Sequence, residues 1–299
     1  MRADKRTSAE EAVATIKAGS TVAIGGVHFH NSPMSLVREI VRQEIGELTV
    51  VGGFSLGIQI DMLVGAGLVS KVICPYVGLE HFGLAPNYRR AVEEGTLDIV
   101  ECDEGLTMYG LRAAAEALPF HPYPEGVLEG TDLPTKEPEW YQQVQNPFDG
   151  STYYVVPPIR PDVALLHTQM ADTAGNGVAM GATAADALMA TASHRVLLTC
   201  DETVPNEWVQ QEHQKTYLLA HWVDHVVETY HPAHPCSSHG MYRYDSQHLE
   251  EYTKAAVEGG EAFTTYLDTY VRQPTSQWNY LQKVGGKRKL AQLRLEGRY

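Results

Sequence analysis

Short apolar runs alternate with longer helix-like segments through the first hundred residues. The runs TVAIGG (21–26), LTVVGG (48–53), SKVICP (70–75) and LDIVECDE (97–104) contain β-branched residues and end at Gly, Pro or acidic positions. Such runs are typical of parallel strands that are buried on both faces. They predict four strands whose carboxyl ends lie together at one edge of a sheet.

Helical segments separate these strands. The first is expected to begin at Thr7 or Ser8, because each is followed three residues later by glutamate, the spacing of a capping box, and to end near Gly19. The second is expected to begin at Ser32-Pro33, with proline at the first helical position. Two further helices are predicted over 57–67 and 104–118.

The alternation stops between 119 and 151 and then resumes. This segment is rich in Pro and Gly and has few periodic apolar positions, so we expect an irregular insertion that is functional or lies at an interface. Beyond it, strands are predicted at 153–158, 162–169, 194–202 and 225–232, with an Ala-rich helix at 182–193. The pattern from 246 to 299 predicts a helical C-terminal tail.

Helix and strand alternation of this kind predicts an α/β fold with an open, mainly parallel sheet flanked by helices. We expect one domain over 1–299. Its 299 residues are 43% hydrophobic, which is enough for a sizeable core.

The net charge argues against two classes of partner, and the cysteines indicate a cellular compartment. There are 37 acidic and 23 basic residues, for a formal net charge of -14, which argues against a nucleic acid or an anionic membrane as partner. One local positive site would still suffice for an anionic substrate. The chain has no apolar run long enough for a membrane span and no signal-peptide pattern, and its four scattered cysteines fit reduced thiols in a cytoplasmic protein.

Ligands of open parallel sheets bind outside the carboxyl ends of the strands. This rule selects the residues that follow the apolar runs, namely 25–28, 52–54, 101–104 and 201–202. Gly25 and Gly26 would let backbone N–H groups approach a ligand oxygen, or would simply form a tight strand exit with no ligand. The spacing is neither GxGxxG nor a Walker loop, so it does not indicate nucleotide phosphate.

Glu104 lies where a strand ends and a helix begins. A carboxylate there can act as nucleophile or general base in a substrate cleft. The alternative is structural, since acidic residues in a first helical turn favour the macrodipole, and Asp103 or Glu104 can cap the helix. The pair Asp201-Glu202 follows its strand in the same way and carries the same two interpretations.

The histidines and cysteines indicate no metal site or nucleophile. His221 and His225 are four residues apart, but their segment has a strand pattern, and HPAHPCSSHG (231–240) fits no zinc spacing. Cys102 lies beside acidic residues, which raise a thiol pKa. Neither a Ser-His-Asp order nor GxSxG is recognisable.

Several segments, taken in order, resemble the alpha subunit of the family I CoA-transferases, of the glutaconate CoA-transferase A type. In chain order they read TVAIGG, SPMSLVREIVRQ, LTVVGG, DEGLTMYGLRAAAEALPFHP, DVALLHTQMADTAGNGVAMG, DALMATASHRVLLTCDETVP and AHPCSSHGMYRYDSQHLEEY. Their order and spacing hold over residues 5 to 260. The resemblance implies a CoA-transferase-like open α/β fold.

It also implies a function and a partner. In heteromeric transferases of this type, the beta subunit supplies a glutamate that attacks the acyl-CoA, forms an acyl-glutamyl anhydride and then a glutamyl-CoA thioester, and passes CoA to a second carboxylate. This chain would be the alpha subunit, joined to a beta subunit in an α2β2 assembly. An acyl-CoA thioester would be its substrate, with no permanently bound cofactor and no metal. Gly25 and Gly26 match the glycine loop of the family, and Val27, His28, His30 and Asn31 would shape the acyl pocket.

One branch of this family is similar in the DEG–GL–AAA–LPF string. It is the alpha subunit of the hydrolase that opens the last steroid ring, a cyclic CoA thioester. There a glutamate of the alpha subunit is the catalytic carboxylate, and Glu104 is the matching position. The branch carries a basic loop before the Pro-Met pair, whereas this chain has VHFHNSPM. The resemblance to this branch implies an alternative function, namely a hydrolase of a cyclic keto-acyl-CoA with Glu104 as its catalytic carboxylate.

Overall fold

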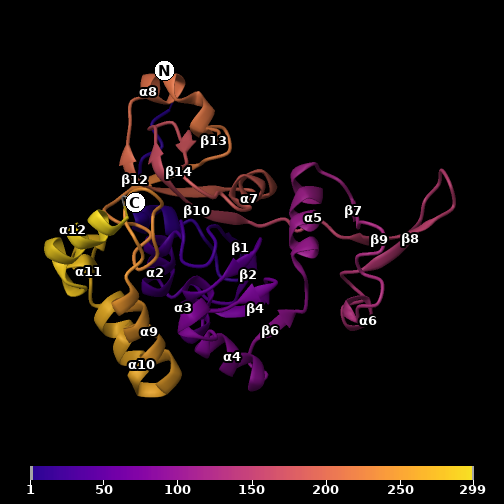
Figure 1. Ribbon diagram of the computed structural model, residues 1–299, viewed down its shortest axis with the longest axis horizontal. Coiled ribbons are helices and arrows are strands. Elements are labelled where there is room, and N and C mark those ends of the chain that lie inside the picture. The colour runs from indigo at the N-terminus through magenta and orange to yellow at the C-terminus, as the bar shows by residue number, and fades with distance from the viewer. Residues whose placement is uncertain (1–2, 298–299) are drawn as a thin grey trace.

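The computed structural model describes residues 3–297. Within these residues, a nine-stranded sheet forms the centre of the molecule, and its parallel part has the order β14-β12-β10-β1-β2-β4-β6 (Figure 1). These strands are β1 (Thr21–Ile24), β2 (Leu48–Gly52), β4 (Val69–Ile73), β6 (Asp98–Val100), β10 (Val163–Ala171), β12 (Val196–Thr203) and β14 (His225–Glu228). Each pairs in parallel with its neighbours in this order, so the prediction of a mainly parallel sheet is confirmed.

Two short strands make the sheet mixed at one side. β11 (Gly177–Val178) pairs antiparallel with the last residues of β10, and β13 (Thr216–Leu218) pairs antiparallel with β11. The sequence did not predict them, because two or three residues are too few to show a period.

Helices cover both faces of the sheet, as predicted. Along β1, Val22 and Ile24 join the core on one face and Ala23 joins the core on the other. The first face is covered by α1 (Ala9–Val13), α2 (Met34–Arg42) and α3 (Ile58–Gly65), and α4 (Pro86–Glu93) packs against α3. The second face is covered by α5 (Glu104–Ala115) and α7 (Asp186–Ala192), which pack against each other.

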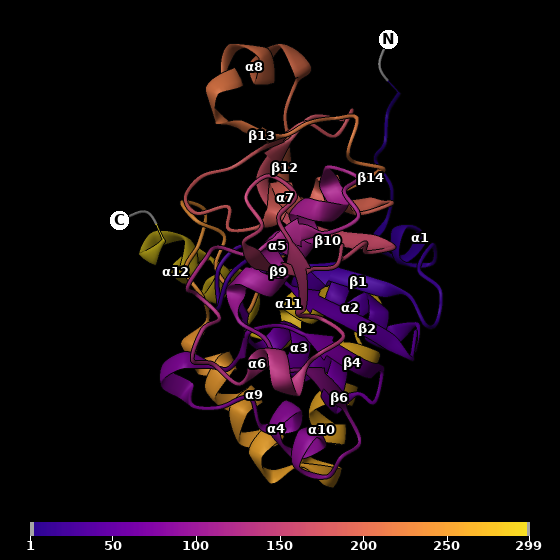
Figure 2. The same ribbon diagram turned by 90° about the vertical axis from the view of Figure 1, so that its right-hand side faces the viewer.

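The C-terminal segment is helical, as expected. It contains α9 (Ser246–Glu258), α10 (Gly260–Leu267), a π-helical segment (Asp268–Arg272), α11 (Gln277–Lys283) and α12 (Gly286–Glu296). Buried residues of α9 and α10, including Tyr252 and Phe263, belong to the same core as α2 and α3. Figure 2 shows these helices behind the strands β2 and β4. Among residues 3–297, no helix combines the length and the apolar character needed to cross a bilayer.

Some element boundaries differ from the sequence predictions. The capping box forms at Ser8 and Glu11, but the first helix ends at Val13 rather than near Gly19. The Thr15 hydroxyl donates to the Ala12 carbonyl at 2.7 Å and the chain continues in tight turns, which ends the helical ladder early. The last predicted strand of the first hundred residues ends at Val100, so that residues 101–103 form a turn before α5.

The segment after α5 is more regular than the expected insertion. Residues 119–156, which we call the arm, contain β7 (His121–Pro122), α6 (Leu133–Lys136), β8 (Gln142–Gln145) and β9 (Thr152–Val156). The three strands form an antiparallel sheet in the order β7-β9-β8. Figure 1 shows the arm extending from the body on the far side of α5. The sequence concealed β8 because its glutamines are exposed and leave no apolar alternation.

The remaining elements are short connections: β3 (Ser55–Leu56) paired in parallel with β5 (Tyr76–Val77), α8 (Asn206–Gln211), and the 3-10 turns Glu80–Phe82 and His213–Lys215.

Candidate active site

The glycine loop after β1 and the acidic turn before α5 are connected at the carboxyl edge of the sheet. The Gly26 N–H donates to Asp186 Oδ1 at 2.9 Å, which joins the loop to the start of α7. The neighbouring Ala185 packs against Gly53 at the end of β2. The Thr107 hydroxyl of α5 donates to the Gly53 carbonyl at 2.8 Å. Contacts through α7 and β2 thus place both predicted site segments along one edge.

Asp103 is the residue that caps α5. Its Oδ1 accepts the Leu106 N–H at 3.1 Å, and its carboxylate also accepts the Tyr123 hydroxyl at 2.5 Å and the Tyr141 hydroxyl at 3.3 Å. Burial, and then the interaction with Asp103, raise the pKa of both tyrosines, which therefore stay protonated donors. The capping role that the sequence left open between Asp103 and Glu104 belongs to Asp103.

Glu104 is the first residue of α5 and is exposed. Within residues 3–297 its carboxylate has no hydrogen-bond or ion-pair partner. The next residue must be glycine, because a Cβ at Gly105 would overlap the Tyr123 hydroxyl. The turn therefore uses Asp103 and Gly105 for packing and leaves Glu104 facing solvent at the sheet edge. Its catalytic role stays a prediction.

The backbone N–H groups of the glycine loop are all used inside the chain. Gly25 donates to the Leu165 carbonyl at 2.9 Å, Val27 to the His30 carbonyl at 3.0 Å, and His28 to the Ser55 carbonyl at 2.9 Å. Together with the bond from Gly26 to Asp186, these contacts occupy the donors that the sequence suggested for a ligand oxygen. Between Gly25 and His28 the loop thus shapes the edge through its packing and has no backbone donor left over for a ligand.

The glycines are required by close packing. A Cβ at Gly25 would lie 2.6 Å from Asp186 Oδ1, and Gly26 has a φ of 84°, in the left-handed region that favours glycine. Asp186 is fully buried, and burial raises its pKa to about 7 although the Gly26 N–H opposes the shift. The carboxyl group therefore sits beneath the loop where a side chain at 25 would otherwise be.

The side chains of 27–31 point in different directions. Val27 is half-buried. His28 lies edge-on to Tyr76, and its Nδ1 is 2.5 Å from Glu80 Oε1 without the alignment of a hydrogen bond. His30 is exposed, and its Nδ1 is 2.6 Å from Ser237 Oγ. Burial and the neighbouring His239 lower the pKa of His30, so the ring is held toward its neutral form.

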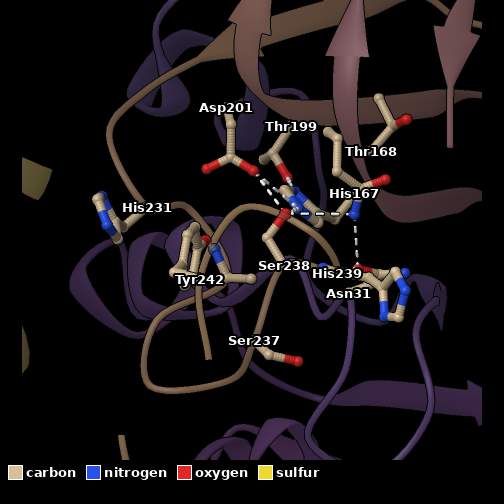
Figure 3. A network of polar contacts seen from close by, with 12 residues as sticks. Asn31, His167, Thr168, Thr199, Asp201, His231, Ser237, Ser238, His239 and Tyr242 are labelled. Carbon is tan, nitrogen blue, oxygen red and sulfur yellow. Dashed lines mark hydrogen bonds and ion pairs between the residues drawn. The ribbon is translucent and has the colours of Figure 1, made fainter. Parts of the chain in front are cut away.

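Asn31 is buried and its side-chain amide makes three hydrogen bonds. Its Oδ1 accepts from Gln169 Nε2 at 2.8 Å and from the His239 N–H at 3.2 Å, and its Nδ2 donates to the Ala182 carbonyl at 3.1 Å. Figure 3 shows Asn31 beside His239, at the lower end of the polar network. Asn31 therefore joins three segments of the chain through three of the four hydrogen bonds that its amide can make.

The same network contains a serine, a histidine and an aspartate that the sequence did not connect. Ser238 Oγ donates to Asp201 Oδ2 at 2.6 Å and lies 3.0 Å from His167 Nε2 (Figure 3). In a catalytic triad the carboxylate binds the second ring nitrogen, but here His167 Nδ1 contacts Thr199 Oγ1 at 3.0 Å. Ser238 and His167 are also buried, so this cluster is structural. Glu202, the other candidate acid, is exposed at the end of β12.

A pocket of about 780 Å³ opens beside the loop. His30 and Ser237 line one side, and His239, Arg243 and Tyr244 belong to its wall. Arg243 is exposed, and the sequence reasoning missed this cation beside the predicted loop residues. Its segment was quoted for the family resemblance, but nothing in the local pattern marks an arginine as facing a pocket.

The other histidines and cysteines have ordinary surroundings. His234 Nδ1 is 2.7 Å from the Tyr280 hydroxyl and its Nε2 is 3.2 Å from Asp245. Burial first, and then Cys74 and nearby acidic groups, raise the pKa of Cys102, so its thiol stays protonated. No group of three or more His, Cys, Asp or Glu side chains in residues 3–297 is arranged to hold a metal ion.

Comparisons with known proteins show the family of this chain. A family model described as coenzyme A transferase matches residues 6–229. An uncharacterized protein of Archaeoglobus fulgidus is 36% identical over 98% of this chain, and the chain spans 65% of the length of that protein. The IpdA subunit of a cholesterol ring-cleaving hydrolase from Mycobacterium tuberculosis is 32% identical, over 88% of this chain and 93% of that protein.

A solved structure shares the fold over nearly the whole chain. A glutaconate CoA-transferase subunit from Acidaminococcus fermentans is 28% identical, over 91% of this chain and 89% of that protein. The crystal structure of glutaconate coenzyme A-transferase from this organism superposes with a TM-score of 0.91, covering 97% of this chain and 95% of that chain.

Proposed function

The chain belongs to the coenzyme A transferase family, and we propose that it is the alpha subunit of a heteromeric enzyme that moves CoA from an acyl-CoA thioester to a carboxylate. The observation that carries this proposal is the arrangement at the start of α5. Asp103 and Gly105 are used for packing, and Glu104 is left exposed and unpartnered among the described residues, at the carboxyl edge of the sheet.

The proposed reaction begins with attack of a carboxylate on the thioester carbonyl. The C–S bond breaks, CoA leaves as a thiolate, and an acyl-glutamyl anhydride remains. The thiolate then attacks the glutamyl carbonyl of the anhydride, which releases the first carboxylate and leaves a glutamyl-CoA thioester. The acceptor carboxylate repeats the two steps in reverse and leaves as the new acyl-CoA.

In this scheme the attacking glutamate belongs to the beta subunit, and Glu104 faces the reacting groups from this chain. From its exposed position at the start of α5, the Glu104 side chain can accept a proton or orient the acceptor. The exposed side of Glu104 would be covered by the partner. We propose an α2β2 assembly, because two-fold symmetry is the commonest closed arrangement of subunits.

The loop after β1 would form one wall of the acyl pocket. Val27, His28 and His30 supply its side chains, while Gly25, Gly26 and Asn31 fix its backbone. Arg243, in the pocket beside His30, offers a positive charge to a carboxylate or a phosphate of the substrate. The substrate is an acyl-CoA thioester, and we propose no permanently bound cofactor.

We place the enzyme in the cytoplasm. Cys74, Cys102, Cys200 and Cys236 are all free, which suits a compartment that keeps thiols reduced.

A second candidate is a hydrolase of a cyclic keto-acyl-CoA. It is favoured by the 32% identity to a ring-cleaving hydrolase subunit together with the free carboxylate of Glu104. In that reaction Glu104 takes a proton from water, and the water oxygen adds to the carbon of the ring carbonyl. The ring C–C bond then breaks, and the carbon next to the thioester, which keeps the electron pair as a carbanion, is protonated.

Product analysis separates the two. The chain is co-expressed with a beta-type CoA-transferase subunit from the same organism, and acyl-CoA consumption is followed with and without a panel of mono- and dicarboxylates. A transferase consumes the donor only when an acceptor is present and yields the acceptor's CoA ester. Consumption that does not depend on the acceptor contradicts the transferase. Full activity of this chain without the partner contradicts its place in a heteromer.

A further inference from the structure

The arm presents an apolar tip to solvent. Phe148 lies in the turn between β8 and β9 and is 95% exposed. The three glutamines of β8 are exposed as well, so this hairpin has little core of its own. The base of the arm is held by β7 and by buried residues such as Val156, whereas the β8–β9 turn that carries Phe148 has no such cover. Covering a phenylalanine that is otherwise in water is worth about 2–3 kcal/mol.

We propose that the arm is the docking surface for the beta subunit, and that Tyr123 and Tyr141 at its root are positioning residues that set Glu104 when the partner is bound. This inference rests on the proposed function, since its occupant is a beta subunit. It adds the surface that the partner uses and the contacts that lead from that surface to the site.

Charge identifies the kind of surface that fits the arm. Between 119 and 151 there are six acidic residues and one lysine, a balance of five negative charges. Lys136 pairs with Glu101 and Asp132, whereas Glu125, Glu129 and Glu139 are exposed. The fitting partner therefore offers an apolar pocket for Phe148 with a basic rim. A second copy of this chain is disfavoured as the occupant, because two acidic arms repel each other.

The root of the arm is joined to the turn that carries Glu104. Tyr123 and Tyr141 donate to Asp103, at 2.5 Å and 3.3 Å, from two different parts of the arm. The Glu101 N–H donates to Glu137 Oε1 at 2.8 Å, which fixes the start of the turn. Through these contacts, residues of the arm hold both ends of the turn 101–104 in place.

The arm also contacts the second turn of α5. The ring of Tyr109 stacks on His121 of β7, with centroids 4.8 Å apart and planes 9° apart. A partner seated on the arm is therefore connected, through the arm's root, to the turn that carries Glu104. Movement of the arm would change the orientation of the first turn of α5.

The docking surface is tested by binding. The co-expressed beta-type polypeptide is purified, and its affinity for the full chain is measured by calorimetry for the wild type, Phe148→Ser and Val257→Ser. Val257 is a matched control, since it is 63% exposed on α9, away from the arm. We expect at least tenfold weaker binding for F148S and unchanged binding for V257S. Wild-type affinity in F148S overturns the proposal, and so does loss of self-association instead of partner binding.

The positioning role is tested by a separate readout. At saturating beta subunit, Y123F, Y141F and the control Y153F are compared for kcat, KM and partner affinity; Tyr153 is half-buried in β9. We expect kcat to fall about tenfold in Y123F and less in Y141F, with partner affinity unchanged. Unchanged kcat in both variants, or a parallel loss of affinity and melting temperature, overturns the role. Binding is read without turnover, so an inactive wild-type pair would contradict the proposed function alone.

Discussion

The hydroxyl of Tyr123 lies 2.5 Å from the carboxylate of Asp103, although the two residues come from different elements, the arm and the cap of α5. The Asp103 carboxylate thereby accepts hydrogen bonds from the Tyr123 hydroxyl and from the Leu106 N–H at the start of α5. The adjacent Glu104 is left as the carboxylate of this turn that has no structural task in the described chain. Substitutions at neighbouring positions of one turn should therefore have different effects.

Glu104→Gln should lower kcat without changing stability. The substitution removes the charge and the proton acceptor but keeps the size of an exposed side chain. Loss of a general base typically costs about 10²–10⁴-fold in rate. The measurement is steady-state turnover of the complex with its beta subunit, next to a thermal melt. Glu94→Gln, at an exposed position after α4, serves as control. Wild-type turnover in E104Q would remove Glu104 from the mechanism.

Gly105→Ala should destabilise the protein and reduce activity together. The added methyl group overlaps the Tyr123 hydroxyl, so either the arm or the first turn of α5 must move. Overpacking of this kind costs about 1–3 kcal/mol. Urea unfolding gives the change in the free energy of unfolding. Gly46→Ala is the control, because the nearest atom to its added Cβ is a Leu68 methyl at 3.9 Å. Equal stability of the two variants would contradict the packing argument.

Asp186→Asn should remove a pH dependence of stability. Burial raises the pKa of Asp186 from 3.8 to about 7, so the folded state keeps a proton that the unfolded state releases. The protonated carboxyl group contributes its full stabilisation of the folded state below about pH 4, and this contribution is lost as the pH rises through 7. The loss is on the order of 4 kcal/mol, because a difference of one in pKa corresponds to about 1.4 kcal/mol.

Asparagine keeps an oxygen for the Gly26 N–H and does not titrate. The difference in the free energy of unfolding between D186N and the wild type should therefore grow in favour of D186N between pH 4 and pH 7 and then stay constant. Chemical denaturation at a series of pH values measures it. Parallel pH curves for the two proteins would show that Asp186 is ionised in both states.

Asn31→Ala should loosen the polar network and raise KM. It leaves Gln169 Nε2, the His239 N–H and the Ala182 carbonyl without their partner. Each buried group left unpaired costs about 1–3 kcal/mol, so we expect a loss of at least about 2 kcal/mol. Denaturant unfolding and substrate titration are the measurements, with the exposed Asn279→Ala as control. A variant as stable as the wild type would mean that water replaces these bonds.

The parallel strands and the C-terminal helices were predictable because each has a long local signal. Buried strands such as β2 and the first five residues of β12 are mostly apolar runs, and α9 begins after a capping aspartate, Asp245. In the arm, β9 was predictable, because it coincides with the strand predicted at 153–158. The strands β7 and β8 were not, because β7 has two residues and three of the four residues of β8 are exposed glutamines, so neither period nor composition reveals them.

The sequence predicted that the candidate segments lie at one edge of the sheet, but not the contacts that they make; their role as a site stays a prediction. The rule for strand ends selected Gly25, Gly26 and Glu104, which the structure places along one edge through α7 and β2. The occupation of the Gly26 N–H by Asp186 depends on a residue 160 positions away in the chain. Such pairings arise from tertiary packing and leave no mark in local spacing.

In the loop after β1, the groups that hold the backbone in place differ from the side chains that the loop presents at the surface. Its backbone and Asn31 are held by bonds to other segments, whereas the His28 side chain accepts no such bond and the His30 side chain has one contact, between Nδ1 and Ser237 Oγ. His28 also has a φ of 49°, which asparagine or glycine adopts more easily. If the loop lines the acyl pocket as we propose, exchange at His30 costs the one contact to Ser237, whereas exchange of His28 for a β-branched or bulky residue meets a backbone cost, so new acyl specificities should evolve first through position 30.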